Sequence, residues 1–268
     1  MRILCIVYGI GRGVRISSQS INNNLLNPIR KLNAELEVLY ILNEVKFVEN
    51  PRSKDNGKVP PVPSQVFGEE ELVRMSKAQL LNKSIFNCVK GFKDVHDDNF
   101  RTYENLLCQL GMLSEANRRR DFSLYDRVLM IRDDLSIEVK NIEIARMLYA
   151  SQFGPVTSMW HWHGGVAERF LLSKPDIASR LADRLQMVES FVRTKGYLNG
   201  EHLQDYALGK DRNTVLAFDL RLTRIRLDGI VDENFLFPIW RPLEFPRVLL
   251  AVFKYYFRIF SKRRLKRK

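Results

Sequence analysis

Short runs of hydrophobic residues, separated by longer polar segments, recur along the first 230 residues. Residues 3–8, 36–42 and 128–131 are apolar runs bounded by glycine or charge. This is the pattern of strands buried on both faces of a sheet. Residues 214–227 instead alternate hydrophobic and polar positions, which predicts one half-buried strand. The runs predict an α/β fold.

Other stretches carry hydrophobic residues at helical spacing. Residues 103–119 have an ordinary core-facing stripe, and a second helix is expected from Pro175 until Gly196 stops it. A helix through residues 21–29 is expected behind three serines. The Pro- and Gly-rich residues 50–68 predict a loop, which is either a lid or a disordered insertion.

Two carboxylates, Asp133 and Asp134, stand where the buried run 128–131 ends. Ligands of open α/β sheets bind beyond the carboxyl ends of the strands. Carboxylates there are well placed to hold a divalent cation and, through it, a diphosphate. The alternative is a solvated turn, because Asp is common in turns.

A glycine- and arginine-rich loop, residues 9–15, follows the first strand. Backbone amides and a helix start after such a loop favour anions, so it is a candidate phosphate cradle. Its glycine spacing is two and two, which is not the dinucleotide-binding fingerprint, and a plain tight turn is the alternative.

The segment WHWHGGVAERF, residues 160–170, concentrates aromatic and polar chemistry. If it is extended, Trp160 and Trp162 share one face while His161 and His163 share the other. Those faces suit stacking on a sugar ring and hydrogen bonding to hydroxyls or phosphate. A packed hairpin with surface histidines is the alternative.

The composition indicates the size of the domain and the cellular compartment. The 268 residues are 45% hydrophobic and 28% charged, as in a globular chain of one large domain. The spacing of the three cysteines is not that of metal ligands, so we expect them to be reduced thiols. The first apolar run is too short for a signal peptide, so we expect a cytoplasmic protein.

The net charge of +12 is concentrated at one end. Residues 241–268 contain ten Lys or Arg against Glu244 alone, a net charge of +9, which leaves +3 for residues 1–240. A nearly neutral body argues against a nucleic-acid groove.

The apolar run 248–260 is interrupted by Lys254 and Arg258, so it is too short and too charged to span a bilayer. We expect it to lie on the inner face of the cell membrane as an amphipathic helix, with an anionic membrane surface as its partner. The expected lipid-facing cations are Lys254, Arg258, Lys262, Arg263 and Arg264. The alternative is a helix packed on the domain with a disordered basic end.

The order of four motifs resembles a group of bacterial and viral nucleotide-diphospho-sugar transferases of the GT-A type. The motifs are RDDL at 132–135, WHWHGGVAERF at 160–170, GYLNGEHLQDYAL at 196–208 and FDLRLTRIRLDG at 218–229. Two departures stand out: Asp133 replaces a frequent Pro, and Ala167 with Glu168 replaces Asn and Asp.

The resemblance implies one GT-A-like, Rossmann-type domain over residues 1–240, with a central mixed sheet, and a basic amphipathic tail over 241–268. It implies a glycosyltransferase that moves a sugar from a nucleotide-sugar donor to a glycan acceptor. The expected acceptor is a lipid-linked glycan used in the assembly of a surface polysaccharide. Rivals are a metal-independent transferase that uses arginines in place of the cation, and a non-catalytic membrane-bound scaffold.

The resemblance also implies roles for particular residues. Glu201 is the expected general base, with Glu168 as its rival, and Asp134 with Asp133 is expected to hold Mn²⁺ or Mg²⁺. The donor is expected to contact Tyr8, Gly9, Arg12, Arg15, Arg132, Asp133 and Asp134. The sugar and acceptor pocket is expected to comprise Trp160, Trp162, His163, Gly164, Gly165 and Arg169.

Overall fold

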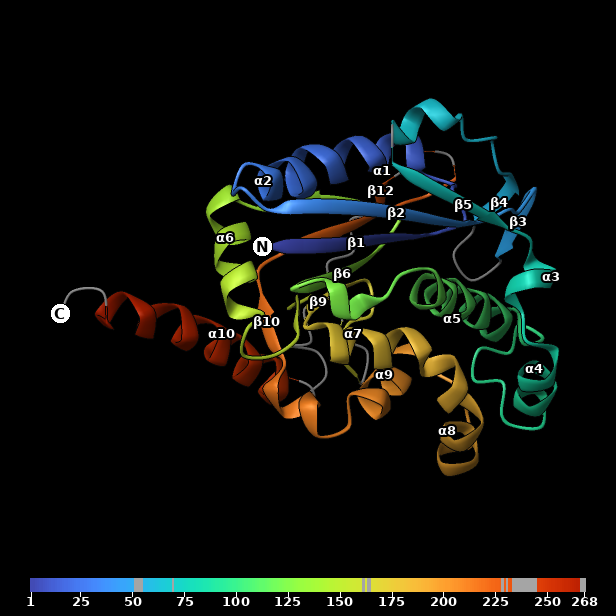
Figure 1. The fold of residues 1–268 in the computed structure, drawn as a ribbon. Helices are drawn as coiled ribbons and strands as arrows, with labels where there is room; N and C mark the ends of the chain where they lie inside the picture. The colour runs from blue at the N-terminus through green and yellow to red at the C-terminus, as the bar shows by residue number, and fades with distance from the viewer. Residues whose placement is uncertain are drawn as a thin grey trace.

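A computed structural model describes residues 1–50, 55–68, 70–160, 162, 165–227, 229, 231–232 and 245–265. Its centre is a seven-stranded sheet with the strand order β10-β8-β9-β6-β1-β2-β5 (Figure 1). The strands are β1 (Arg2–Gly9), β2 (Glu35–Asn43), β5 (Glu71–Met75), β6 (Arg127–Arg132), β8 (Val156–Ser158), β9 (Phe170–Ser173) and β10 (Leu216–Phe218). Only β9 runs antiparallel to its neighbours in this sheet. The predicted α/β class with a central mixed sheet is confirmed.

The three predicted core strands lie side by side at the centre of the sheet. In the parallel register, Tyr8 of β1 is opposite Arg132 of β6 and Ile41 of β2. The carboxyl ends of β1, β2 and β6 therefore meet at one edge, where a ligand site is expected.

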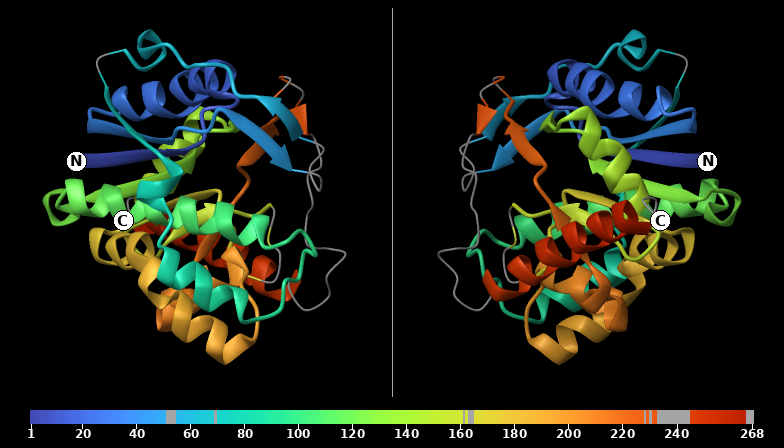
Figure 2. Two further views of the ribbon diagram at one scale, coloured as in Figure 1. Left: turned by 90° about the vertical axis from the view of Figure 1, so that its right-hand side faces the viewer. Right: turned by 90° about the vertical axis from the view of Figure 1, so that its left-hand side faces the viewer.

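Helices cover both faces of the sheet, as the side views in Figure 2 show. One face carries α1 (Val14–Ile21), a π-helical segment (Asn22–Leu26), α2 (Asn27–Arg30) and α6 (Asn141–Ala150). The other carries α3 (Lys77–Leu80), α5 (Arg101–Arg119), α7 (Pro175–Ala182) and α9 (Gly200–Leu208). Beyond α5, α4 (Lys83–Lys90) and α8 (Val188–Lys195) enclose a smaller apolar cluster.

The helix predicted at residues 103–119 is observed, and the one predicted from Pro175 to Gly196 is divided into α7 and α8 by a 3₁₀ segment at Asp183–Met187. The first predicted helix begins earlier than expected. Helix α1 starts at Val14, so Ser17, Ser18 and Ser20 lie inside it and cap nothing. Ser17 donates a hydrogen bond to the carbonyl of Asp133, and Ser20 accepts one from the Ile137 N–H at 2.8 Å. The serines tie the helix to the segment that follows β6.

Residues 214–227 form two strands, so the prediction of a single strand is wrong. The chain turns between β10 and β11 (Arg221–Ile225), where the Leu220 N–H bonds the Phe218 carbonyl at 2.9 Å. Strand β11 belongs to a separate antiparallel sheet with β7 (Leu135–Glu138) and β12 (Val231–Asp232).

The predicted loop at 50–68 contains regular structure. Strands β3 (Phe47–Asn50) and β4 (Asp55–Lys58) pair as an antiparallel hairpin, while residues 51–54 lie outside the described residues. Short 3₁₀ segments complete the fold: η3 (Ser64–Phe67), η4 (Phe122–Leu124), η5 (Asp183–Met187) and η6 (Gly209–Thr214).

The C-terminal helix α10 (Phe245–Leu265) packs against β10 and α6. Its inner face is buried, and Tyr255 stacks on Phe218 with ring centroids 5.5 Å apart while its hydroxyl bonds Glu143 at 3.0 Å. Among the helices as far as they are described, none has the length and hydropathy needed to cross a bilayer. The inner face of α10 is therefore part of the core; the expected domain boundary at 240 lies outside the described residues.

Two positions on α10 test this docking. Tyr255→Ala removes a fully buried aromatic ring, so we expect a loss of about 3–5 kcal/mol in the free energy of unfolding. Phe253→Ala lies on the same helix, but its side chain is 66% exposed, so we expect a change below about 1 kcal/mol. Denaturant titration of both variants measures the difference, and equal small losses would contradict a docked helix.

Candidate active site

A cavity of about 560 Å³ opens beyond the carboxyl ends of β1, β2 and β6. Its size is within the usual range for small-molecule sites. Nine residues predicted as functional line it: Tyr8, Gly9, Arg12, Arg132, Asp133, Asp134, Glu168, Arg169 and Glu201. Segments from four separate parts of the chain are thus brought together, and we call this space the strand-end cavity.

Asp133 holds the glycine-rich loop in place. Its Oδ2 accepts a hydrogen bond from the Gly11 N–H at 2.5 Å, and its own N–H donates to the Tyr8 carbonyl at 2.9 Å. A Cβ at Gly9 would lie 1.7 Å from Asp133 Oδ1, so no larger residue fits there. Burial and the charge of Asp134 raise the pKa of Asp133 to about 7. The role of Asp133 in this structure is to shape the loop.

Asp134 is surrounded by three arginines, Arg12, Arg132 and Arg224, which we call the arginine cluster. Its Oδ2 accepts hydrogen bonds from Arg12 Nη2 at 2.5 Å, Arg132 Nη2 at 2.7 Å and Arg224 Nε at 3.0 Å. Burial alone raises the pKa of Asp134, but the three positive charges outweigh it and hold the pKa well below its usual range. Asp134 is therefore a buried anion that assembles cations from three segments.

This arrangement does not fit the predicted divalent cation. Both oxygens of Asp134 accept hydrogen bonds from guanidinium groups, and Asp133 Oδ2 is used by the loop. In the part of the chain that the structure describes, no three His, Cys, Asp or Glu side chains are grouped to hold a metal ion. The assignment of Asp133 and Asp134 as metal ligands is not supported by this geometry.

Arg169 differs from the arginine cluster because it has no carboxylate of its own. Among the described residues its guanidinium makes no hydrogen bond or ion pair, although it lines the cavity. Burial and the nearby charge of Arg132 lower its pKa. A half-buried guanidinium in this setting favours an anionic ligand, because an incoming negative charge offsets the cost of partly desolvating it.

Two carboxyl groups lie near this arginine: Glu168 directly precedes it in the chain, and Glu201 is in the first turn of α9. Asn199 caps the helix, its Oδ1 accepting a hydrogen bond from the His202 N–H at 2.9 Å, and Glu201 follows. Glu168 packs against Gly200, where a Cβ would lie 2.3 Å from its Oε2. Burial and the charge of Glu168 raise the pKa of Glu201 to about 7. A carboxyl that titrates near neutral pH is suited to accept or donate a proton.

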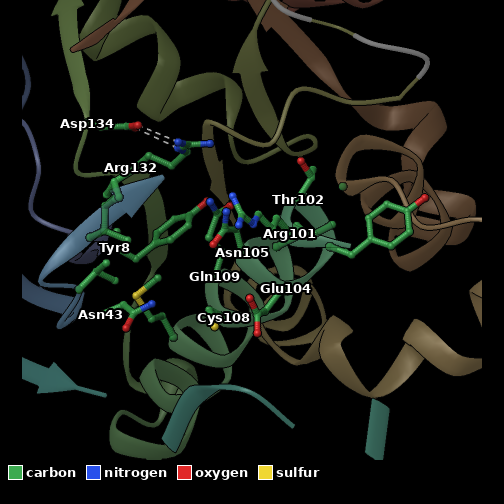
Figure 3. Close-up of a pocket in the computed structure, with 18 of the residues that line it drawn as sticks. Tyr8, Asn43, Arg101, Thr102, Glu104, Asn105, Cys108, Gln109, Arg132 and Asp134 are labelled. Atoms are coloured by element: carbon green, nitrogen blue, oxygen red, sulfur yellow. Dashed lines mark hydrogen bonds and ion pairs between the residues drawn. The ribbon is translucent and has the colours of Figure 1, made fainter. Parts of the chain in front are cut away.

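The far end of the cavity was not predicted from the sequence. Figure 3 shows Asn43, at the end of β2, and the α5 side chains Asn105 and Gln109 in this pocket with Arg132 and Tyr8. Asn43 is buried, and its Oδ1 has no hydrogen-bond partner. No sequence signal distinguishes these amides, because single Asn and Gln residues are common in any surface segment.

The predicted sugar pocket is largely absent from the cavity. Trp162 is 3% exposed in the core, and its indole N–H donates to the Ser158 carbonyl at 2.8 Å. Trp160 lies beside Asp219, to which its Nε1 donates at 2.8 Å. Gly165 faces the backbone of Glu201, where a Cβ would lie 2.1 Å from the carbonyl oxygen. These three residues stabilise the fold and do not line the cavity.

The remaining predicted residues divide as follows. Arg169 is the one member of the sugar and acceptor set placed in the cavity, since His163 and Gly164 lie outside the described residues. Of the two loop arginines, Arg12 lines the cavity, whereas Arg15 is exposed and does not.

No protein-family model matches the sequence, and the comparison with curated proteins gives no match. Three solved structures with a similar chain path are glycosyltransferases. Mouse xyloside xylosyltransferase 1 is 10% identical, with a TM-score of 0.43 over 82% of this chain and 86% of that one. The galactosyltransferase LgtC, solved with donor and acceptor sugar analogues, is 12% identical, with a TM-score of 0.40 over 80% and 72%. The glycosyltransferase GlyE of Streptococcus pneumoniae TIGR4 is 10% identical, with a TM-score of 0.39 over 81% and 45%.

At these TM-scores the likeness carries no argument about activity. The function is therefore argued from the strand-end cavity itself.

Replacing the central anion tests the arginine cluster. Asp134→Asn removes the buried carboxylate that pairs with Arg12, Arg132 and Arg224, so we expect a loss of about 3–5 kcal/mol in the free energy of unfolding. Inorganic pyrophosphate should stabilise this variant more than the wild type, because it can replace the missing charge. The control is Glu35→Gln, which breaks an exposed ion pair with Arg2 worth at most about 1 kcal/mol. Equal losses in both variants would contradict the account.

Proposed function

We propose that this protein is a glycosyltransferase that moves a sugar from a nucleotide-diphosphate donor to a glycan acceptor. The observation that carries the proposal is Arg169, a half-buried guanidinium without a hydrogen-bonded carboxylate partner among the described residues, placed beside the arginine cluster. The carboxyl pair of Glu168 and Glu201 lines the same cavity. A cation-rich end and a titratable carboxyl pair are the two elements that this reaction needs.

The donor's diphosphate is assigned to Arg169 and the arginine cluster. Guanidinium groups bind phosphate oxygens through paired hydrogen bonds, and they need no reorganisation when held by a buried anion. As the bond between the anomeric carbon and the diphosphate oxygen breaks, negative charge grows on that oxygen. Fixed positive charge at this point stabilises the leaving group. The arginines thus take the part that a metal ion was expected to play.

The nucleobase is assigned to the amide-lined end of the cavity. Asn43 Oδ1 is a buried acceptor without a partner, and burying such a group is costly unless a ligand donates to it. A base N–H supplies that donor. The wall of the cavity between Asn43 and Arg132 includes Tyr8 and Gly9, which fit the donor role expected from the sequence.

The acceptor's proton is assigned to the carboxyl pair. The acceptor hydroxyl oxygen bonds to the anomeric carbon, the carbon–diphosphate bond breaks, and the hydroxyl proton passes to a carboxylate of Glu201 or Glu168. Because the pKa of Glu201 is raised to about 7, its carboxyl can accept or release a proton near neutral pH.

The acceptor is proposed to be a lipid-linked glycan in the assembly of a bacterial surface polysaccharide, such as lipopolysaccharide O-antigen or capsule. The charge of +9 in the last 28 residues supports an acceptor held at a membrane surface. The net charge of only +3 over residues 1–240 disfavours a nucleic-acid partner.

Nucleotide binding tests the proposal most simply. The melting temperature is measured with UDP, GDP, CMP and dTDP, each with chelator and with Mn²⁺, because a ligand of the folded state raises it. We expect a rise with at least one nucleotide in chelator. Arg169→Gln should weaken that binding by about tenfold or more, since hydrogen bonds to charged groups contribute about 1.5–3 kcal/mol. The matched control, Arg15→Gln, should leave it unchanged.

Three results would change the proposal. A shift that appears only with Mn²⁺ would restore the metal role of Asp133 and Asp134. Equal effects of the two arginine substitutions would remove Arg169 from the donor site. The absence of a shift with every nucleotide would favour the non-catalytic scaffold.

The raised pKa of Glu201 predicts a pH-dependent effect of Glu201→Gln. Between about pH 4.5 and pH 7 the unfolded chain releases this proton and the folded protein keeps it, so the wild type loses stability as pH rises. Glutamine does not ionise. We expect the stability of the variant relative to the wild type to increase by on the order of 2 kcal/mol from pH 5 to pH 8. Unfolding titrations at both values measure it, and a constant difference would contradict the assignment.

A further inference from the structure

The side of α10 that faces away from the core is apolar. Four of its large hydrophobic side chains, which we call the outer face of α10, are more than half exposed: Leu249 at 52%, Leu250 at 51%, Phe253 at 66% and Phe257 at 59%. The rings of Phe253 and Phe257 stack with centroids 6.2 Å apart, so the surface is continuous. The inner face of the helix already holds it on the core, and the outer face contributes nothing to that docking.

Such a surface is unusual in a soluble protein. Single exposed hydrophobic residues are ordinary, and this chain has several, such as Leu124 at 61%. A row of four on one helix indicates a binding surface instead. The sequence pattern alone did not separate these residues from the buried side of the same helix, because both sides are apolar.

The cations predicted to face lipid on α10 are partly used by the domain. Lys254 Nζ donates to the Asn213 carbonyl at 2.6 Å, and the Arg258 guanidinium lies over the Phe153 ring at 5.2 Å from its centroid. The side chains of Lys262, Arg263 and Arg264 lie outside the described residues. The structure therefore supports the apolar outer face as a contact surface better than it supports the predicted cations of the helix. In the sequence this face is followed by the basic end KRRLKRK.

We propose that the outer face of α10 inserts into the interface of an anionic lipid bilayer, with the basic C-terminal end binding the headgroups. A helix that combines large apolar side chains with a run of Lys and Arg is suited to lie in the plane of such an interface. Charge complementarity selects the anionic lipid, because +9 of the net +12 lies in residues 241–268. The surface in the cell is the inner leaflet of the membrane.

The docking of α10 gives this contact a fixed orientation. Because Tyr255 and its buried neighbours attach the helix to the core, the domain binds as one body. Figures 1 and 2 show α10 on the side of the molecule away from α4 and the β3–β4 hairpin. Residues of β3 and α5 line the strand-end cavity, so binding through α10 leaves that side uncovered.

A second copy of this chain is a poorer occupant of the same face. Pairing two outer faces would bring two segments of charge +9 together, and like charges repel at short range. Anionic headgroups remove this repulsion and bury the aromatic rings at the same time.

Vesicle flotation of the full-length chain tests the proposal. We expect the wild type to float with vesicles of phosphatidylglycerol and phosphatidylethanolamine and to remain unbound with phosphatidylcholine alone. The double variant Phe253→Ser/Phe257→Ser should bind the anionic vesicles about tenfold more weakly, because it removes most of the insertable area. Leu124→Ser is the matched control at an equally exposed site on η4, and it should bind like the wild type.

Three results would overturn the proposal: no flotation of the wild type, equal binding by the double variant and the wild type, or loss of binding by the control variant. A wild-type dimer without lipid that the double variant dissociates would assign the face to a second copy. Melting temperatures close to the wild type's confirm that the variants are folded. Vesicle binding requires no nucleotide, so this test is independent of the proposed enzymatic function.

Discussion

The structure around the cavity depends on the buried negative charge of Asp134. This carboxylate is 2% exposed at the end of a core strand, where an isolated charge would be very costly. Arg12 from the loop after β1, Arg132 from β6 and Arg224 from β11 compensate it. Because one buried carboxylate pairs with all three arginines, the segments that supply them are held together.

The same network extends to the β3–β4 hairpin. Arg12 also pairs with Asp55, whose Oδ1 accepts a hydrogen bond from the Leu227 N–H at 3.0 Å. The loop after β1 is held a second time by Asp133. The cavity thus has a wall built from charge pairs, and beside it lies Arg169, whose guanidinium pairs with no carboxylate among the described residues. A preorganised wall of this kind binds an anion without rearranging.

The sequence predicted the parts of this architecture that are local. The buried runs of β1, β2 and β6 were evident from their hydrophobicity, and the rule that strand ends meet at one edge placed the loop and Asp134 together. The helical stripe of α5 was equally clear. The expected positions of Glu168, Arg169 and Glu201 came from the resemblance, and all three line the cavity.

The predictions that were wrong concern features that depend on contacts between residues distant in the sequence. Arg224 pairs with an aspartate 90 positions earlier, and no local pattern shows that the carboxylate's oxygens are already used. The two tryptophans were expected on one face of an extended segment, but Trp162 is buried in the core and bonds the carbonyl of Ser158, the last residue of β8. The split between β10 and β11 likewise follows from sheet pairing, which hydrophobic periodicity does not encode.

The most direct test of the central claim compares a nucleoside diphosphate with its parent nucleoside by calorimetric titration in the presence of chelator. If the arginines bind the diphosphate, the diphosphate should bind at least about tenfold more tightly, a difference of about 1.4 kcal/mol, and added salt should reduce that difference. Equal affinities of the two ligands, or a preference for the diphosphate only when a divalent cation is added, would contradict the account.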